Sequence, residues 1–207
     1  MKDYQAIFKI WQKQNPHPKI ELLYTTPFEL LVATILSAQA TDAGVNKATP
    51  ELFRVANTPE AILGLGLDGL KFYIKTIGLY PSKAKHIMAM SQLLVERHGG
   101  KVPRSREALE ALPGVGRKTA NVMLNTLWDE PVIAVDTHVY RVSRRLGFSK
   151  GETPLAVEKD LMKVIPTEFL KHAAHWLVLH GRYTCVARKP KCSICPLSKW
   201  CDYFKTL

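Results

Sequence analysis

The sequence has no hydrophobic segment long enough to cross a membrane. The longest largely apolar run near its start covers residues 30–36, whereas a membrane-spanning helix needs about 20 apolar residues. Residues 1–14 mix charged with apolar side chains and lack the apolar core of a secretion signal. We therefore expect an intracellular, cytoplasmic protein.

Strand signals are also scarce. Only residues 131–135 resemble a strand, and one strand cannot make a sheet. Helix signals recur instead. Thr-Pro pairs, each an N-cap followed by a first-turn proline, stand at 26–27, 58–59 and 153–154. Apolar spacing predicts further helices over 3–14, over 82–98 before Gly99, and over 167–180 before Gly181. The expected fold class is all-α.

Acidic residues are few compared with basic ones. The chain has 29 Lys and Arg against 18 Asp and Glu, a formal net charge of +11. This excess suits a polyanion such as DNA, because each neutralised phosphate releases a counterion. Charge alone fits a merely soluble basic protein as well. The 207 residues, 46% of them hydrophobic, suffice for one large or two small cores, and we expect two helical lobes with a cleft between them.

Residues 112–120 (LPGVGRKTA) lie between two helices expected over 105–111 and 117–128. Pro113 and Gly114 end the first helix. Gly114 and Gly116 allow a tight turn in which backbone N–H groups lie open to a phosphate, and the positive dipole end of the second helix points the same way. The pattern predicts a helix-hairpin-helix turn that binds an anion.

Lys118 stands in the first turn of that second helix. A nucleophilic amine has to be neutral part of the time, and the helix N-terminus and Arg117 disfavour the charged form of Lys118. DNA phosphates would act in the opposite direction, so the sequence leaves the pKa of Lys118 undecided. An ordinary exposed lysine is the alternative interpretation.

Asp136 follows an apolar run and begins a helix expected to end at Gly147. Its side chain suits a helix N-cap. A carboxylate there also suits stabilisation of an oxocarbenium-like sugar, as in glycoside cleavage. Lys118 and Asp136 together supply a nucleophile and an electrostatic or acid–base partner, whereas His138 is expected to serve packing or the helix surface.

All the cysteines of the chain lie in one short stretch, as Cys185, Cys192, Cys195 and Cys201. Disulfides are not expected inside a cell. Four thiolates suit either zinc or a 4Fe-4S cluster, and the spacing matches neither the usual zinc nor the ferredoxin patterns, so both stay open. Basic residues in the same loop suit contact with phosphates, namely Arg188, Lys189 and Lys191.

Taken together, these motifs resemble the endonuclease III family of the helix-hairpin-helix DNA glycosylase superfamily. Besides the cysteine array, the resemblance rests on LSAQATD (36–42), IGLY (77–80), LPGVGRKTAN (112–121), AVDTH (134–138) and HGRYTC (180–185). It covers almost the whole chain. It implies a 4Fe-4S cluster on the four cysteines.

The resemblance also implies an architecture. A barrel of about six helices occupies residues 19–130, with the hairpin at about 105–124. A second helical domain, which carries the cluster, joins residues 1–18 to residues 131–207. The active site lies in the cleft between the two domains.

The implied activity is base-excision repair by a DNA N-glycosylase with AP lyase activity. Lys118 attacks C1′ of the damaged nucleotide, a Schiff base forms, and β-elimination nicks the strand 3′ to the abasic site. Asp136 supports the charge that develops on the sugar. The implied substrates are oxidised, ring-saturated pyrimidines in duplex DNA, and the implied protein is a monomer associated with the nucleoid of a bacterium.

The resemblance further assigns residues that contact DNA. Gln39 fills the gap left by the flipped nucleotide and Leu79 wedges the duplex. Without the family, these two would be interpreted as a helix-end glutamine and a core leucine. The hairpin, through Gly114, Gly116 and Arg117, holds a backbone phosphate, and its carbonyls bind a monovalent cation.

Two alternatives compete with this interpretation. An adenine-mismatch glycosylase relative shares the hairpin and the cluster, but it lacks the lysine at this position and carries an additional C-terminal domain. A non-catalytic helix-hairpin-helix DNA-binding protein with structural zinc would explain the charge and the glycines. It would leave Lys118 and Asp136 without a purpose.

Overall fold

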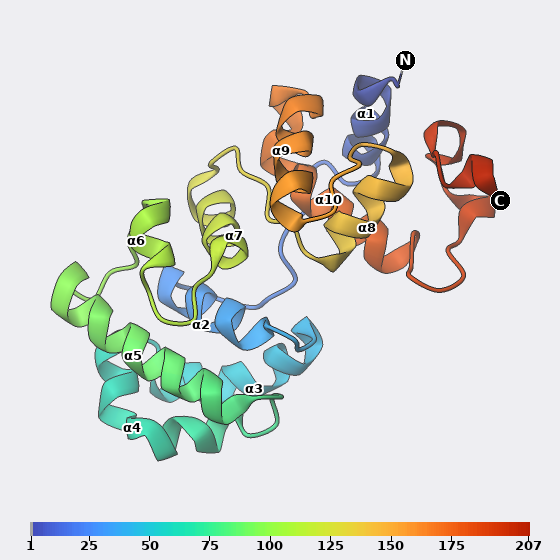
Figure 1. The fold of residues 1–207 in the computed structure, drawn as a ribbon. Helices are drawn as coiled ribbons and strands as arrows, with labels where there is room; N and C mark the ends of the chain where they lie inside the picture. The colour runs from blue at the N-terminus through green and yellow to red at the C-terminus, as the bar shows by residue number, and fades with distance from the viewer. Residues whose placement is uncertain (1) are drawn as a thin grey trace. The chain divides into compact units, whose positions relative to one another are not determined.

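The computed structural model describes residues 2–207, and every regular element in that range is a helix. The predicted all-α fold class is confirmed, and residues 131–135 form no strand. No helix among the described residues is long and apolar enough to cross a membrane. The chain forms two compact units, one of Glu21–Trp128 and the other of the N-terminal segment up to residue 20 with Asp129–Leu207 (Figure 1).

The unit Glu21–Trp128 is built around one buried helix. Its elements are α2 (Pro27–Ser37), α3 (Asp42–Val55), α4 (Pro59–Ile74), α5 (Tyr80–His98), α6 (Arg106–Glu110) and α7 (Arg117–Trp128). Helix α2 packs against α3, α5 and α7, and every residue from Phe28 to Leu36 is buried. A helix that is apolar on all sides needs such a central position.

The starts of the helices follow from local chemistry. The hydroxyl of Thr26 accepts a hydrogen bond from the Glu29 N–H at 3.1 Å, which caps α2. Thr58 and Thr153 cap α4 and α9 (Pro154–Val164) in the same way. The helix starts predicted from the three Thr-Pro pairs are therefore confirmed. Helix α3 was not predicted, because Pro50 inside it ordinarily signals a helix end.

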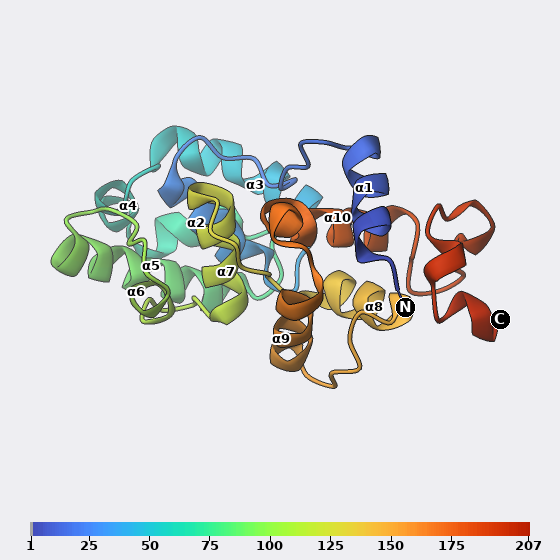
Figure 2. The same ribbon diagram turned by 90° about the horizontal axis from the view of Figure 1, so that it is seen from above.

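The other unit contains α1 (Tyr4–Gln14), α8 (Thr137–Leu146), α9, α10 (Leu170–Tyr183) and a C-terminal loop with short 3-10 turns. Helix α1 lies beside α10 in both views (Figures 1 and 2). Aromatic rings hold this unit together. The ring of Phe8 stacks on that of Phe169, with 5.6 Å between ring centroids. The rings of Phe8 and Trp11 meet edge to face, with 5.2 Å between their centroids.

The helix predicted to end before Gly181 begins and ends later than expected. After a 3-10 turn at Thr167–Phe169, α10 continues through Gly181 to Tyr183. Gly181 is buried, and an added Cβ there would lie 2.9 Å from the Cβ of His138 and 3.0 Å from Cγ2 of Val142. The glycine therefore permits the close approach of α10 to α8 and does not end the helix.

Gly181→Ala should lower the free energy of unfolding by about 1–3 kcal/mol, because the added methyl group overpacks the contact between α8 and α10. Thermal and denaturant unfolding of the cluster-loaded protein measure the loss. Gly64→Ala in α4 is the matched control, because an added Cβ there meets no atom within 4 Å and alanine favours a helix. Equal destabilisation of the two variants would contradict the packing role of Gly181.

Candidate active site and cysteine loop

The hairpin between α6 and α7 is anchored from below by two buried apolar residues. Leu112 and Val115 face the core, and the Val115 N–H donates to the Leu112 carbonyl at 3.0 Å. Gly114 adopts a left-handed φ of +82°, and an added Cβ would lie 2.9 Å from the Cβ of His86. The turn therefore needs glycine at this position for both conformation and space.

Gly116 has a different role from the one expected. Its φ is not in the left-handed region, and an added Cβ would meet no atom within 4 Å. The turn itself therefore requires only Gly114. Gly116 is exposed immediately before α7, where the absence of a side chain leaves the N-terminal backbone of that helix accessible to a ligand.

Lys118 lies in the first turn of α7, and its side chain is exposed. The neighbouring Arg117 is exposed as well. Both cations therefore project from the helix end that already carries partial positive charge. This arrangement presents a primary amine beside a surface suited to phosphate.

Asp136 caps α8, as predicted. Its Oδ1 accepts hydrogen bonds from the N–H groups of His138 and Val139, each at 2.8 Å. Its Oδ2 lies 3.2 Å from Nδ1 of His138, and the Asp136 side chain keeps 20% of its surface exposed. The cap fixes one oxygen of the carboxylate and leaves the other beside a histidine, a partner for Asp136 that the sequence interpretation did not include.

Gln39 and Leu79 share an unusual backbone conformation. Their φ angles are +54° and +62°, in the left-handed region that residues other than glycine rarely occupy. Both side chains are exposed, Leu79 to 59%. The interpretation of Leu79 as a core leucine is therefore wrong. Two strained turns hold an amide and an apolar side chain out toward solvent.

Lys83 links the end of α2, just before Gln39, to the first turn of α5, just after Leu79, and the sequence interpretation missed it. Its Nζ donates to the carbonyl of Leu36 at 2.8 Å, close to the end of α2, and its backbone N–H donates to the Leu79 carbonyl at 3.1 Å. Lys83 is only 5% exposed, and burial lowers its pKa. A lysine within the apolar pattern of α5 gave no signal that it would be buried.

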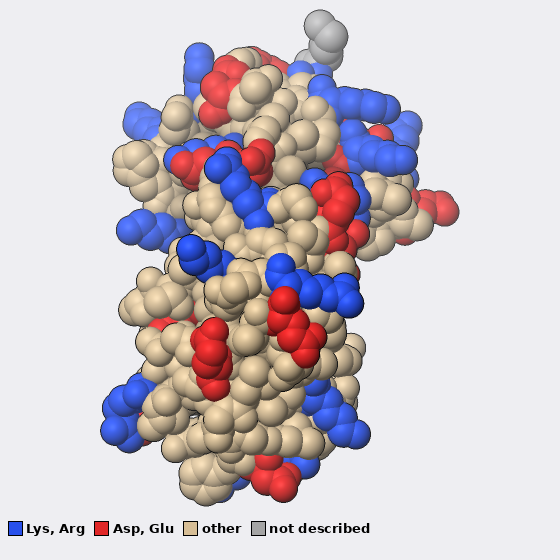
Figure 3. Space-filling model, turned by 90° about the vertical axis from the view of Figure 1, so that its left-hand side faces the viewer, with Lys and Arg blue, Asp and Glu red and all other residues tan. Residues whose placement is uncertain are grey.

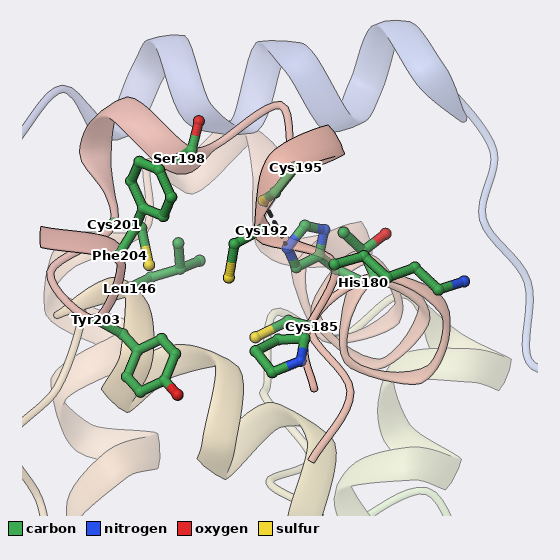
Figure 4. A pocket seen from close by; sticks show the side chains of 12 residues that line it. Leu146, His180, Cys185, Cys192, Cys195, Ser198, Cys201, Tyr203 and Phe204 are labelled. Carbon is green, nitrogen blue, oxygen red and sulfur yellow. Dashed lines mark hydrogen bonds between the residues drawn. The ribbon is translucent and has the colours of Figure 1, made fainter. Parts of the chain in front are cut away.

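The four cysteines surround one pocket (Figure 4). Cys185, Cys192, Cys195 and Cys201 line it together with His180 and Leu146. No three His, Cys, Asp or Glu side chains among the described residues are placed to hold a single metal ion, but the four sulfur atoms gather around one space. Such a set is suited to a polynuclear centre.

The chemistry of the thiols fits a metal-bound state. Burial raises the pKa of the Cys195 thiol and of the Cys201 thiol, and nearby cysteines raise both further. The thiolate forms of these two residues therefore need positive charge nearby. An iron–sulfur cluster supplies that charge.

Arg145 supports this loop from α8 and was not singled out in the sequence. Its guanidinium donates to the carbonyls of Val186 and Ala187 at 2.8 and 3.0 Å, and Nη1 lies 3.5 Å from Sγ of Cys185. The basic residues of the loop are exposed, namely Arg188, Lys189 and Lys191. The structure brings them together with the cysteines on one short segment.

The face seen in Figure 3 carries no continuous basic stripe. Lys and Arg side chains gather at the upper right of this view, and elsewhere they are interspersed with Asp and Glu and with uncharged surface. The positive net charge is therefore not concentrated on this face. Exposed cations are grouped in two short segments instead. Arg117 and Lys118 lie at the hairpin, and Arg188, Lys189 and Lys191 lie in the cysteine loop.

Comparison with known proteins agrees with this geometry. Residues 32–167 match the HhH-GPD superfamily base excision DNA repair proteins, and residues 185–201 match the iron-sulfur binding domain of endonuclease III. The fold, the hairpin and the cysteine loop thus define a helix-hairpin-helix base excision DNA repair protein. The four-cysteine loop is the site of its 4Fe-4S cluster, which confirms the predicted cofactor.

Proteins of similar sequence and structure show to which family within this superfamily the chain belongs. Endonuclease III of Haemophilus influenzae is 62% identical over 93% of this chain and 91% of its own length, and that of Escherichia coli is 58% identical over the same shares. A solved structure described as a trapped endonuclease III–DNA covalent intermediate matches 100% of this chain and 99% of its own, with TM-score 0.92 and 45% identity. The chain belongs to the endonuclease III family.

Cys192→Ser should lower both thermal stability and affinity for lesion DNA. Only Leu197 and Cys201 are buried in the 185–201 loop, so the metal has to organise it. Lys191→Ala is the control, because it removes one exposed cation and should shift the salt slope of DNA binding by about one unit. Melting, and binding to a lesion duplex across a salt series, compare the two. A cysteine variant that melts and binds like the parent would exclude the organising role.

Proposed function

We propose that this enzyme removes oxidised, ring-saturated pyrimidines from duplex DNA and then cleaves the strand 3′ to the resulting abasic site. The observation that carries the proposal is the exposed Lys118 in the first turn of the helix that follows the hairpin. The covalent endonuclease III–DNA intermediate described for a 45% identical structure supports it. A covalent bond to DNA requires a nucleophile on the protein.

Lys118 acts as that nucleophile. The neutral amine attacks C1′ as the damaged base departs with the electron pair of the glycosidic bond. Opening of the sugar ring gives a Schiff base between Nζ and C1′. A proton then leaves C2′, its electron pair forms a C2′–C3′ double bond, and the 3′ phosphate departs. Water hydrolyses the imine and releases the enzyme.

Asp136 stabilises the positive charge that develops on the deoxyribose while the base leaves. The helix cap holds Oδ1 through two N–H groups at 2.8 Å, so the orientation of the carboxylate is fixed before DNA binds. His138 contacts the other oxygen at 3.2 Å and limits its rotation. Preorganised charge of this kind costs no reorganisation at the moment of reaction.

Gln39 and Leu79 act on the duplex itself. A base in a helix hides its glycosidic bond, so the nucleotide has to leave the stack. The apolar side chain of Leu79 replaces lost stacking, and the amide of Gln39 bonds to the orphaned partner base. Through its side-chain bond to the Leu36 carbonyl, Lys83 ties the end of α2, just before Gln39, to the first turn of α5, just after Leu79. Ring-saturated bases stack poorly, which favours their extrusion.

Phosphates are held at two further places. The backbone around Gly114 and Gly116 receives one phosphate near the lesion, next to Arg117. Arg188, Lys189 and Lys191 contact the DNA backbone through the cysteine loop. A monovalent cation on the hairpin carbonyls stays a prediction. Because its proposed substrate is duplex DNA, we expect the enzyme to act in the cytoplasm, in association with the nucleoid.

Lys118→Gln should abolish strand nicking and covalent trapping with borohydride on an abasic-site duplex, while binding of lesion DNA persists because the hairpin contact is made by backbone groups. Lys47→Gln is the matched control, because Lys47 is an exposed lysine on α3 whose replacement removes the same charge. The control should trap like the parent. Persistent trapping by Lys118→Gln would point to a different nucleophile.

Asp136→Asn should keep the fold but slow base excision in single-turnover assays. The amide oxygen still caps α8, whereas the lost stabilisation of positive charge is worth several kcal/mol, by analogy with about 2.7–4 kcal/mol for one oxyanion-hole donor. Asp3→Asn is the control, because Asp3 caps α1 through its Oδ1 and the Ala6 N–H. Unchanged excision by Asp136→Asn would leave Asp136 as a helix cap only.

A further inference from the structure

His180 lines the cysteine pocket shown in Figure 4 and contacts the cysteine loop through both its backbone and its side chain. Its carbonyl accepts the N–H of Cys185 at 2.7 Å. Its Nε2 lies 3.6 Å from Sγ of Cys195. The repair mechanism gives this buried histidine, which is 7% exposed, no task.

Trp11, on α1, reaches the other side of the same imidazole. The indole Nε1 lies 3.4 Å from Nδ1 of His180, and the two rings meet edge to face, with 5.5 Å between their centroids. Trp11 is 3% exposed, so water cannot substitute for this contact. The contacts therefore run from the aromatic core through His180 to a cysteine of the cluster site.

The direction of these hydrogen bonds follows from the donor chemistry. An indole N–H can only donate, so Nδ1 of His180 has to be the acceptor. A neutral imidazole that accepts at Nδ1 carries its proton on Nε2. That N–H faces Sγ of Cys195, which as a thiolate can only accept. The tautomer is thus determined by the partner at each end of the ring.

We propose that Trp11 and His180 form a hydrogen-bond relay that directs one N–H onto the Cys195 thiolate and raises the reduction potential of the 4Fe-4S cluster. A donor beside a cluster sulfur stabilises negative charge, and the reduced cluster carries more of it than the oxidised one. His180 positions the ligand and tunes it, and Trp11 orients His180. This inference rests on the cluster alone and is independent of Lys118 and Asp136.

The reduction potential of the cluster-loaded protein tests the relay. Trp11→Phe keeps an aromatic ring but removes the N–H, so His180 loses its fixed orientation and the potential should fall. His180→Phe removes the donor altogether and should lower the potential further. Trp176→Phe is the matched control: Trp176 is 2% exposed in the same core, but its indole N–H donates to the Asn15 carbonyl at 2.8 Å, away from the cluster.

The proposal requires the parent protein to have the highest reduction potential, Trp11→Phe a lower one and His180→Phe the lowest. The potential of Trp176→Phe has to equal that of the parent. Any other order overturns it. Iron and sulfide analysis of each variant ensures that only loaded protein is compared. A benzothiophene side chain at position 11, which exchanges the N–H for sulfur at nearly constant shape, replaces Trp11→Phe if that variant does not load.

A second measurement needs only the parent protein. Spectra of the loaded protein with nitrogen-15 labelled histidine report which ring nitrogen of His180 carries the proton. The expected result is a protonated Nε2 and an unprotonated Nδ1. The opposite tautomer, or a ring protonated at both nitrogens at neutral pH, overturns the relay whatever the variants show.

Discussion

The burial of α2 from Phe28 to Leu36 is the constraint on which the unit Glu21–Trp128 depends. Leu36, near the end of this helix, is 0% exposed, so its carbonyl needs a partner from the protein. The ammonium of Lys83 provides it, at 2.8 Å from a site with 5% exposure. Because Lys83 stands in the first turn of α5, this bond ties the end of α2, just before Gln39, to the start of α5, just after Leu79.

The same helix positions the hairpin. Helix α7 packs against α2 and α6, and Leu112 and Val115 bury themselves beneath the turn. Gly114 then passes so close to His86 on α5 that no side chain fits. The proposed nucleophile, Lys118, therefore stands beside a turn whose position follows from core packing. A nucleophile on a rigid element keeps its geometry when the substrate arrives, which a mobile loop could not ensure.

Features with a local cause could be predicted from the sequence. Three helices begin at a threonine whose hydroxyl accepts a hydrogen bond from the N–H three residues later, namely Thr26, Thr58 and Thr153. A stretch of four residues therefore suffices to predict each of these helix starts. The cap at Asp136 and the turn at Gly147, with φ of +72°, are equally local. The cysteines suggested a metal site, but spacing alone did not choose between zinc and iron–sulfur.

Features that depend on tertiary contact could not be predicted in this way. Gly181 looked like a helix end until α8 proved to lie against it, and Leu79 looked like a core residue until its left-handed turn placed it outside. Lys83 and Arg145 had ordinary surroundings in the sequence, and the motif that contains His180 gave no role to its imidazole. Each acquires its role from a partner more than ten residues away, which no periodicity encodes.

The cysteine loop shows why those distant partners matter for a cofactor. Leu197 is the one fully buried side chain between Cys185 and Cys201, so the loop has almost no core of its own. The metal has to hold the loop, together with Arg145 of α8 and His180 of α10, which contact it. His180 belongs to the aromatic core through Trp11 and to the loop through Cys195, so packing in the core reaches the cluster sulfur directly. Under the proposed relay, a change in that core that leaves all four ligands intact therefore still alters the reduction potential of the cluster.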